Sequence, residues 1–268
     1  ENYIIVDVGA NLTNKKYSRD LDSVIQRAKD AGVQKIMVTG ASIRSSKEAL
    51  RLTRIYPGTL YSTAGVHPHD AKSWENPDTL QELESIANNP ECVAIGECGL
   101  DYSRDFSDPE TQRAVFHKQV ELACQLTKPL VIHERGAQTD VLEVLNHYKN
   151  CLPPVLIHSF IGTAKEAQIY LDHGFYLGIT GYLCKDKSDS GIRQLLEKRL
   201  APLDRILIET DAPFMYPNTR ASKLPVHRNE PCALPAIVEM VAAFMKIAPE
   251  EVALATAFNA LKLFGLNQ

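Results

Sequence analysis

The amino-acid sequence predicts an α/β protein with a TIM-like (β/α)8 barrel, regular or distorted, and two observations support this fold class. Short apolar runs alternate with longer amphipathic stretches along the whole chain, as buried strands alternate with helices in a barrel. The length of 268 residues is typical of one such barrel. A doubly wound open sheet is the alternative, because the number of strands does not show whether a sheet closes.

The apolar runs give the positions of the strands. Each run is short and rich in β-branched or apolar side chains, as parallel strands buried on both faces are. The eight expected strands are Ile4–Val8, Lys35–Thr39, Leu60–Ala64, Val93–Gly96, Pro129–Ile132, Val155–Ile157, Tyr176–Ile179 and Ile206–Ile208.

Capping-box patterns predict where helices begin between these strands. In a capping box, Ser or Thr precedes Glu by three residues, and each side chain bonds to the backbone N–H of the other. The three pairs are Ser45 with Glu48, Ser107 with Glu110, and Thr163 with Glu166. No linker, low-complexity tract or repeat interrupts the alternation, so we expect a single domain over residues 1–268.

Composition restricts the class of protein. The apolar fraction is 44% and the net charge is −4, so any binding of a polyanion must depend on a local basic surface. The six cysteines are scattered without a C-x-x-C pair, which predicts reduced thiols in a cytosolic protein. The sequence shows no transmembrane run and no signal or transit peptide. We therefore expect a protein without a membrane partner, located in the cytoplasm, with the nucleus as a second location. The expected barrel has no obvious exposed apolar stripe, so we expect a monomer.

Side chains that can bind a metal or transfer a proton lie at the C-terminal ends of six of the expected strands. In a barrel, the C-terminal ends of the strands share one face, and active sites are assembled on that face. The six residues are Asp7, His67, Glu97, His133, His158 and Asp211. Glu97, His133 and His158 supply one carboxylate and two imidazoles, a set that binds a divalent ion and leaves positions for water and substrate. A bound ion activates water and a second carboxylate, Asp211, accepts the proton, so the pattern predicts a metal-assisted hydrolase.

The charge of this centre indicates a phosphodiester substrate. One divalent cation with one carboxylate and two neutral imidazoles is net positive and attracts a phosphate oxygen. His67 is expected to bind a neighbouring phosphate oxygen, with Arg135 and Arg104 on the same rim. The segment 212–231 is locally basic. Its basic side chains are Arg220, Lys223, His227 and Arg228, and candidates for stacking on bases are Phe214, Tyr216 and Tyr182.

Each of these residues also has a structural interpretation. Tyr182 and Tyr216 are more typical of loop packing than of base stacking. Arg228 can pair with Glu230, and Arg220 and Lys223 can be ordinary solvated surface residues. A lone histidine is usually structural, but two histidines and two carboxylates at four strand ends favour a metal site.

Six short motifs, spread over nearly the whole chain, together resemble the TatD-type deoxyribonucleases. They are Asp7-Val8-Gly9-Ala10-Asn11-Leu12, Gly65-Val66-His67-Pro68-His69, Gly96-Glu97-Cys98-Gly99-Leu100-Asp101, His158-Ser159-Phe160, Glu209-Thr210-Asp211-Ala212-Pro213 and Arg228-Asn229-Glu230-Pro231. The resemblance implies a distorted TIM barrel and Mg²⁺-dependent cleavage of DNA, often from the 3′ end of single strands. Mn²⁺ or Zn²⁺ is the alternative ion and RNA the alternative substrate. Roles in DNA repair and apoptotic DNA fragmentation are associated with this family.

The resemblance also implies roles for individual residues. Glu97, His133 and His158 are implied metal ligands, and Asp211 is a ligand or general base. The implied catalytic residues are His67, Asp211 and Glu97; Asp7 is a weaker candidate ligand. The expected substrate contacts are His67, Arg135, Arg104, Arg228 and Asn11.

The chain departs from the family pattern at three places. Many members carry Asp-x-His-x-His on the first strand, whereas this chain has Gly9 and Asn11, as in the branch that begins Gly-x-Asn-Leu. A single ion, or a second ion held weakly by Asp7 and other carboxylates, is therefore expected. Glu134 replaces a cysteine beside His133 and adds a negative charge. Ser159 also replaces a cysteine, which is a mild change.

Two other functions are compatible with the sequence. The same fold and ligand types serve hydrolysis of small amides, esters or lactones. A fully occupied binuclear site would favour that substrate class, and the residues Gly9 and Asn11 count against it. The loss of the first-strand histidines also allows a non-catalytic interaction module, although the remaining constellation of ligands is complete.

Overall fold

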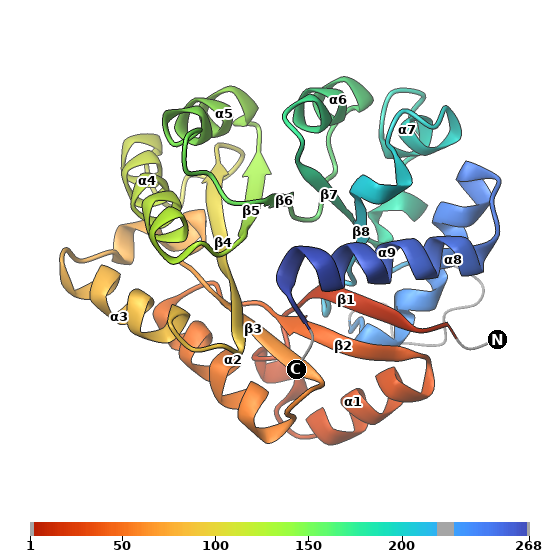
Figure 1. Cartoon of the computed structure of the whole chain (residues 1–268), viewed down its shortest axis with the longest axis horizontal. Helices are drawn as coiled ribbons and strands as arrows, with labels where there is room; N and C mark the ends of the chain where they lie inside the picture. The colour runs from red at the N-terminus through yellow and green to blue at the C-terminus, as the bar shows by residue number, and fades with distance from the viewer. Residues whose placement is uncertain (1–2, 219–227, 267–268) are drawn as a thin grey trace. The chain divides into compact units, whose positions relative to one another are not determined.

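The computed structural model describes residues 3–218 and 228–266 (Figure 1). The eight strands lie in one sheet in chain order, and helices alternate with them, which is the topology of the predicted (β/α)8 barrel. The strands are β1 (Ile5–Ala10), β2 (Val33–Val38), β3 (Leu60–Ala64), β4 (Cys92–Asp101), β5 (Leu130–Arg135), β6 (Val155–Ile157), β7 (Tyr176–Ile179) and β8 (Ile206–Ile208).

The longer helices are α1 (Leu21–Asp30), α2 (Ile43–Ile55), α3 (Asp78–Ala87), α4 (Pro109–Leu126), α5 (Gln138–His147), α6 (Ala164–Asp172), α7 (Ile192–Glu197), α8 (Leu234–Met245) and α9 (Pro249–Phe264). Short 3-10 helices are η1 (Lys15–Tyr17), η2 (Pro68–Ser73), η3 (Gly181–Cys184), η4 (Leu203–Arg205) and η5 (Pro231–Ala233). The chain divides into two compact units, one of residues 1–37 and 159–268 and the other of residues 38–158. That these form a single catalytic domain stays a prediction.

The first unit contains both ends of the strand order. β7 pairs with β8 in parallel, with Leu177 opposite Ile206, and β1 contacts β8. Helices α8 and α9 pack on each other and on β1 and β8 (Figure 1). The contact between the first and last strands is the one that closes a barrel sheet.

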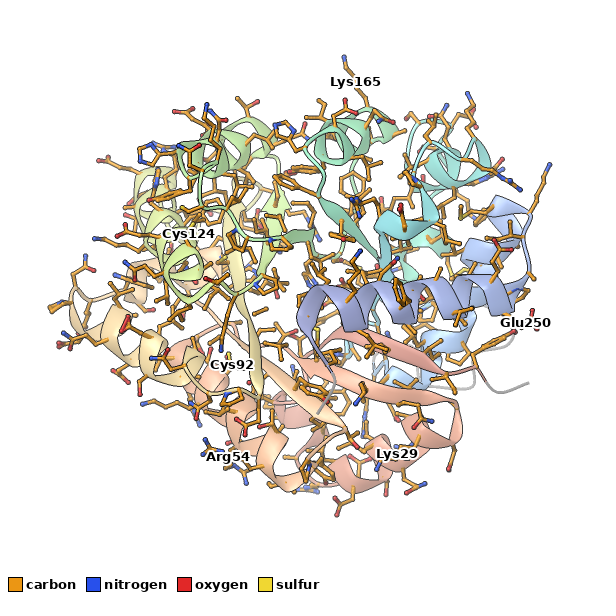
Figure 2. All side chains as sticks on the ribbon, viewed as in Figure 1. Lys29, Arg54, Cys92, Cys124, Lys165 and Glu250 are labelled. Carbon is orange, nitrogen blue, oxygen red and sulfur yellow. The ribbon has the colours of Figure 1, made fainter. Side chains whose placement is uncertain are left out.

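The second unit contains four consecutive parallel strands, β3 to β6. Helix α4 packs against β4, and α2 packs against β3. Charged side chains such as Lys165 in the first unit and Arg54 in the second are exposed, whereas Cys92 at the start of β4 is fully buried (Figure 2). All six cysteines are free thiols.

Strand β4 is longer than the sequence predicts, because it continues through Glu97 to Asp101. Its register with β5 pairs Gly96 with Val131 and Cys98 with Ile132, so Glu97 is the extra residue of a β-bulge. Gly99 has a φ of +141°, and a Cβ there would lie 2.0 Å from the carbonyl oxygen of His133. Only glycine fits so close to β5, and the bulge that results re-aims the Glu97 side chain.

Strand β5 likewise extends beyond the expected end at Ile132 and includes His133. Two of the three predicted capping boxes are also displaced. The box of α2 joins Ser42 to Ser45, and the N-cap of α4 is Asp108, which accepts a hydrogen bond from Thr111. The box that joins Thr163 to Glu166 at α6 is confirmed.

Two buried glutamines of α4 fix the backbone at the ends of β3 and β4. The Gln119 side chain accepts a bond from Val66 N–H at 2.8 Å and donates to Val66 C=O at 3.0 Å. Gln112 makes the corresponding pair with Asp101, at 2.8 Å and 3.1 Å. The two glutamines are seven residues apart and lie on one face of the helix. Helix α4 therefore positions the segments that carry His67 and Asp101.

Over the described part of the chain, no single helix is both long and apolar enough to cross a membrane. The helical segments Pro231–Met245 and Pro249–Phe264 pass that test only as a pair, which is bent by 114°.

We expect Gln119→Leu to lower the free energy of unfolding by about 2–4 kcal/mol, because the buried Val66 N–H and C=O lose their partners. Urea denaturation measures this change. Gln81→Leu, on the exposed face of α3, is the control and should change stability by no more than about 0.5 kcal/mol. Equal stability of the two variants would show that Gln119 does not hold the His67 segment.

Candidate functional site

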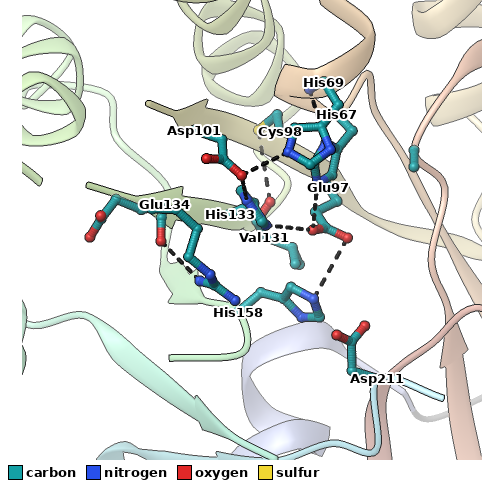
Figure 3. A network of polar contacts seen from close by, with 12 residues as sticks. His67, His69, Glu97, Cys98, Asp101, Val131, His133, Glu134, His158 and Asp211 are labelled. Atoms are coloured by element: carbon teal, nitrogen blue, oxygen red, sulfur yellow. Dashed lines mark hydrogen bonds and ion pairs between the residues drawn. The ribbon is translucent and has the colours of Figure 1, made fainter. Parts of the chain in front are cut away.

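Glu97 is the centre of a buried cluster of imidazoles in the second unit (Figure 3). Its Oε1 lies 3.3 Å from His67 Nε2 and 3.2 Å from His133 Nδ1. Its Oε2 lies 3.6 Å from His158 Nε2. The bulge in β4, the ends of β3 and β5, and the residue after β6 thus bring four of the predicted site residues together.

The electrostatics of this cluster favour the charged carboxylate. Burial alone would raise the pKa of Glu97, but the neighbouring His158 and His67 and the hydrogen bond from His133 outweigh it and hold the pKa well below its usual value. For His133, burial lowers the pKa, and the bonds to Asp101 and Glu97 more than compensate and raise it. A carboxylate that neighbouring imidazoles keep charged is also stabilised by a cation bound among them.

The spacing of these side chains fits a shared ion. Two ligand atoms at about 2.1 Å from one ion, with a near-tetrahedral angle between them, lie about 3.4 Å apart. The Glu97 oxygens lie 3.2 Å from His133 Nδ1 and 3.6 Å from His158 Nε2. Each of these two distances matches a pair of ligands on one ion; that Glu97, His133 and His158 all bind the same divalent ion stays a prediction.

Asp101 is a further site residue that the sequence analysis did not select. Its Oδ2 lies 2.9 Å from His133 Nε2 and 2.7 Å from His69 Nε2, and Ser103 donates to its Oδ1. Burial raises the pKa of Asp101, but the bonds from His133, Ser103 and His69 hold it well below the usual value. Asp101 thus fixes the ring of His133 with Nδ1 directed at Glu97, as carboxylates behind metal-bound histidines do.

Asp101 escaped prediction because the expected strand ended at Gly96. In a strand, residues two apart point to the same face. Because β4 continues through Asp101 and has a bulge at Glu97, the carboxylates of Glu97 and Asp101 both reach the imidazoles. The signal was present in the motif from Gly96 to Asp101, but the length of the strand was underestimated.

A second possible ligand group is formed by His67, His69 and His133, whose ring nitrogens lie within 4.8 Å of one another. The hydrogen bonds argue against it. The backbone N–H of His69 donates to His67 Nδ1 at 3.1 Å, so the neutral His67 ring carries its proton on Nε2. A protonated Nε2 cannot bind a metal, but it can donate to an oxygen. These hydrogen bonds favour the predicted Glu97 group over the three histidines, and the metal site and the phosphate contact of His67 stay predictions.

The first unit contains the other predicted site residues. Asn11 donates from Nδ2 to Asp211 Oδ1 at 3.0 Å and to the Ala212 carbonyl at 3.0 Å. The backbone N–H of Asp211 also donates to the Gly9 carbonyl at 2.8 Å. Asn11 thus orients the Asp211 carboxylate. Because Asp211 and Glu97 belong to different units, their binding of one ion stays a prediction.

Asp7 is fully buried and is bound by the segment that precedes Asp211. Its oxygens accept bonds from Gly9 N–H at 3.1 Å, Thr210 N–H at 3.0 Å and the Thr210 hydroxyl at 2.6 Å. Burial raises the pKa of Asp7 to about 7, the bonds from Thr210 and Gly9 oppose that rise, and Glu209 adds to it. These contacts show that Asp7 links the ends of β1 and β8, and its role as a weak ligand stays a prediction.

The predicted basic rim is only partly described. Arg228 donates from Nη2 to both carboxylate oxygens of Asp20 at 2.7–2.8 Å, and its Nη2 lies 3.9 Å from Glu230. Arg228 is therefore held in an ion pair, in agreement with its structural interpretation. Arg104 is exposed, and Arg135 is half-buried with Nη1 donating to the Glu134 carbonyl. Arg220, Lys223 and His227 lie outside the described residues.

The aromatic side chains that were candidates for base stacking differ in how exposed they are. Tyr216 is 7% exposed and Phe214 is 53% exposed, so of these two only Phe214 presents its ring to a ligand. Tyr182 is half-buried. The Glu134 carboxylate accepts a bond from the Ala137 N–H at the start of α5. This bond accounts for a glutamate beside His133.

The pKa of Asp7 predicts a pH-dependent stability in metal-free protein. An acid whose pKa is raised on folding, from about 3.9 in the unfolded chain, stabilises the fold fully below that value. This stabilisation is lost as the pH rises to about 7. At neutral pH, Asp7→Asn should recover up to about 4 kcal/mol of the free energy of unfolding that ionisation of Asp7 removes.

Urea denaturation in EDTA at several pH values between 4 and about 8 measures the effect. We expect the stability difference between Asp7→Asn and the unchanged protein to grow in favour of the variant as the pH rises. Asp22→Asn, at an exposed position of α1, is the matched control. A difference independent of pH would show that Asp7 is already ionised in the folded chain.

Comparison with known proteins points to one family. The family model described as TatD related DNase matches residues 6–265. A protein named 3′-5′ ssDNA/RNA exonuclease TatD, from Erwinia tasmaniensis, is 42% identical over 260 residues, which are 97% of this chain and 99% of that protein.

Solved structures show the same similarity. A TatD family hydrolase from Entamoeba histolytica has a TM-score of 0.88 at 26% identity, over 98% of both chains. A TatD homologue from Escherichia coli K12 has a TM-score of 0.87 at 26% identity, over 97% of this chain and 98% of that one. These comparisons confirm the barrel and the resemblance in the motifs: the chain belongs to the TatD related DNase family.

Proposed function

We propose that this chain is a divalent-metal-dependent 3′-5′ exonuclease that hydrolyses single-stranded DNA, with RNA as a second substrate. As a member of the TatD related DNase family, it is a hydrolase of phosphodiester bonds in nucleic acid. The observation that carries the proposal is the buried Glu97 carboxylate with three imidazoles around it. The polarity and the choice of single strands follow relatives named for those activities.

The ion supplies Lewis acidity toward the phosphate and the attacking water when it is bound by Glu97, His133 and His158. Family membership and the histidine–carboxylate cluster indicate a divalent metal. Mg²⁺ is the ion we propose, because the resemblance of the motifs to the TatD-type deoxyribonucleases implies it. Mn²⁺ and Zn²⁺ are expected to substitute, because imidazole is a good ligand for both.

The side chains around the proposed ion site have separate proposed roles. Asp101 holds His133 so that Nδ1 faces the ion site, and Asn11 holds Asp211 ready to accept a proton from water. His67 carries its proton on Nε2, which faces Glu97 at 3.3 Å, and is proposed to donate to a phosphate oxygen bound beside that carboxylate. Arg104 and Arg135 are proposed contacts to neighbouring phosphates. A single domain, a monomeric state and links to DNA repair or DNA fragmentation stay predictions.

The function is tested with end-labelled oligonucleotides. We expect single-stranded DNA to be shortened from its 3′ end, with no cleavage in EDTA and recovery with Mg²⁺ or Mn²⁺. Glu97→Gln should lower kcat by about 10³-fold or more, because the neutral amide no longer binds the ion or neutralises its charge. Glu84→Gln, on α3 at a half-buried surface position, is the control.

Two results would contradict this function, and a third would contradict the role of Glu97. Intact single-stranded DNA with every divalent ion tested would remove the nuclease proposal. Rapid hydrolysis of a small amide, ester or lactone, far above any nuclease rate, would favour the other substrate class that the sequence allows. A fully active Glu97→Gln variant would show that Glu97 is not a ligand.

The role of Asp101 is tested separately, because it acts through His133. Asp101→Asn should weaken Mn²⁺ binding by about 10- to 100-fold and leave kcat partly recoverable at high Mn²⁺. Calorimetry and activity measured against metal concentration give the two quantities. Unchanged affinity would show that Asp101 does not orient the ligand, and loss of kcat that no metal concentration restores would assign it another role.

A further inference from the structure

A cavity of about 400 Å³ lies in the first unit, beside the loop that follows Asp211. Its volume is within the range of pockets that hold small ligands. The described residues that line it include two lysines and two aromatic rings and no carboxylate. In a chain with a net charge of −4, this composition favours an anionic, aromatic ligand. The lining side chains used below are Lys16, Lys185 and Phe214.

Phe214 presents its ring from a firmly held loop. The side chain is 53% exposed, whereas the backbone on both sides of it is bonded. Its N–H donates to the Asp211 carbonyl at 2.9 Å, and its carbonyl accepts from Asn229 Nδ2 at 2.9 Å. Asn229 N–H also donates to the Pro213 carbonyl at 3.1 Å. A rigid exposed ring loses little conformational entropy when a planar ligand stacks on it.

The same asparagine also holds the turn that carries one of the two lysines. Tyr17, adjacent to Lys16 in η1, is fully buried and donates from its hydroxyl to the Asn229 carbonyl. The turn that carries Lys16 and the loop that carries Phe214 are therefore attached to one residue. Lys16 itself is exposed at the rim of the cavity.

The second lysine is positioned by a close backbone contact. A Cβ at Gly181 would lie 2.1 Å from the Met215 carbonyl oxygen, so glycine alone allows η3 to pack against the Phe214 loop. Lys185 follows η3 directly and lines the cavity. Three chain segments thus converge with two ammonium groups and one exposed ring.

We propose that this cavity is a nucleotide subsite for single-stranded nucleic acid, in which a base stacks on Phe214 and backbone phosphates contact Lys16 and Lys185. This inference rests on the proposed function for the identity of the polymer. Stacking on an aromatic ring with phosphate contacts to lysines is the usual way to bind single strands without regard to sequence. Because Phe214 is three residues beyond Asp211 and bonded to it, the subsite adjoins the proposed general base.

Binding is tested without catalysis, with a fluorescent oligothymidylate in EDTA. Phe214→Ala should weaken binding by about 5-fold or more, and Phe214→Trp should retain it, because the contact is stacking. Lys16→Ala and Lys185→Ala should each reduce the slope of log K against log salt by about 0.7. Fluorescence anisotropy across a salt series measures both quantities.

The matched controls come from the same unit. Phe258→Ala removes another exposed ring, on α9. Lys15→Ala removes a lysine that is adjacent to Lys16 in the chain but does not line the cavity. Both should bind as the unchanged protein does.

The outcomes separate this subsite from the proposed reaction. If the unchanged protein binds the oligonucleotide and Phe214→Ala binds it equally well, the subsite is wrong, whether or not DNA is hydrolysed. An unchanged salt slope in both lysine variants, or no binding by the unchanged protein, also overturns it. If Phe214→Ala loses binding while the unchanged protein hydrolyses no DNA, the subsite stands and the proposed function fails.

Discussion

The placement of one carboxylate among three imidazoles is the constraint on which the second unit depends. Glu97 is 5% exposed, and a charged carboxylate at such a position is costly unless neighbouring groups compensate it. The compensation comes from His67, His133 and His158, on three different strand ends. A set of groups so arranged is suited to exchange its protons for a divalent cation. The bulge in β4, the close approach of Gly99 to β5, and the hydrogen bonds from Gln112 and Gln119 of α4 all help to bring the carboxylate and the imidazoles together.

The sequence predicted the barrel well, because eight short apolar runs separated by helical stretches are a strong periodic signal. Strands β3, β6, β7 and β8 have their predicted bounds. The largest error was in β4, which was expected to end at Gly96 and continues to Asp101. In the structure, Gly96 and Gly99 allow a bulged strand to continue against β5. Pattern reasoning treats glycine as an end of a strand, and the close approach of a neighbouring backbone is visible only in three dimensions.

In the candidate site, too, the sequence predicted some residues, whereas others became visible only in the structure. Glu97, His133 and His158 were found because their residue types and positions after strands are informative by themselves. Asp101 and Gln119 were missed because their roles depend on partners far away in the sequence, such as His133 and Val66. Asn11 holds the carboxylate of Asp211, a contact that the sequence did not indicate, and its contact with substrate stays a prediction.

The central claim is that Glu97, His133 and His158 bind one divalent ion. An anomalous difference map from crystals soaked in Mn²⁺ tests it most directly. The account predicts a peak about 2.1 Å from a Glu97 oxygen, His133 Nδ1 and His158 Nε2, with His67 Nε2 outside bonding distance. A peak held by His67, His69 and His133 without Glu97, or no peak among these residues, would contradict it.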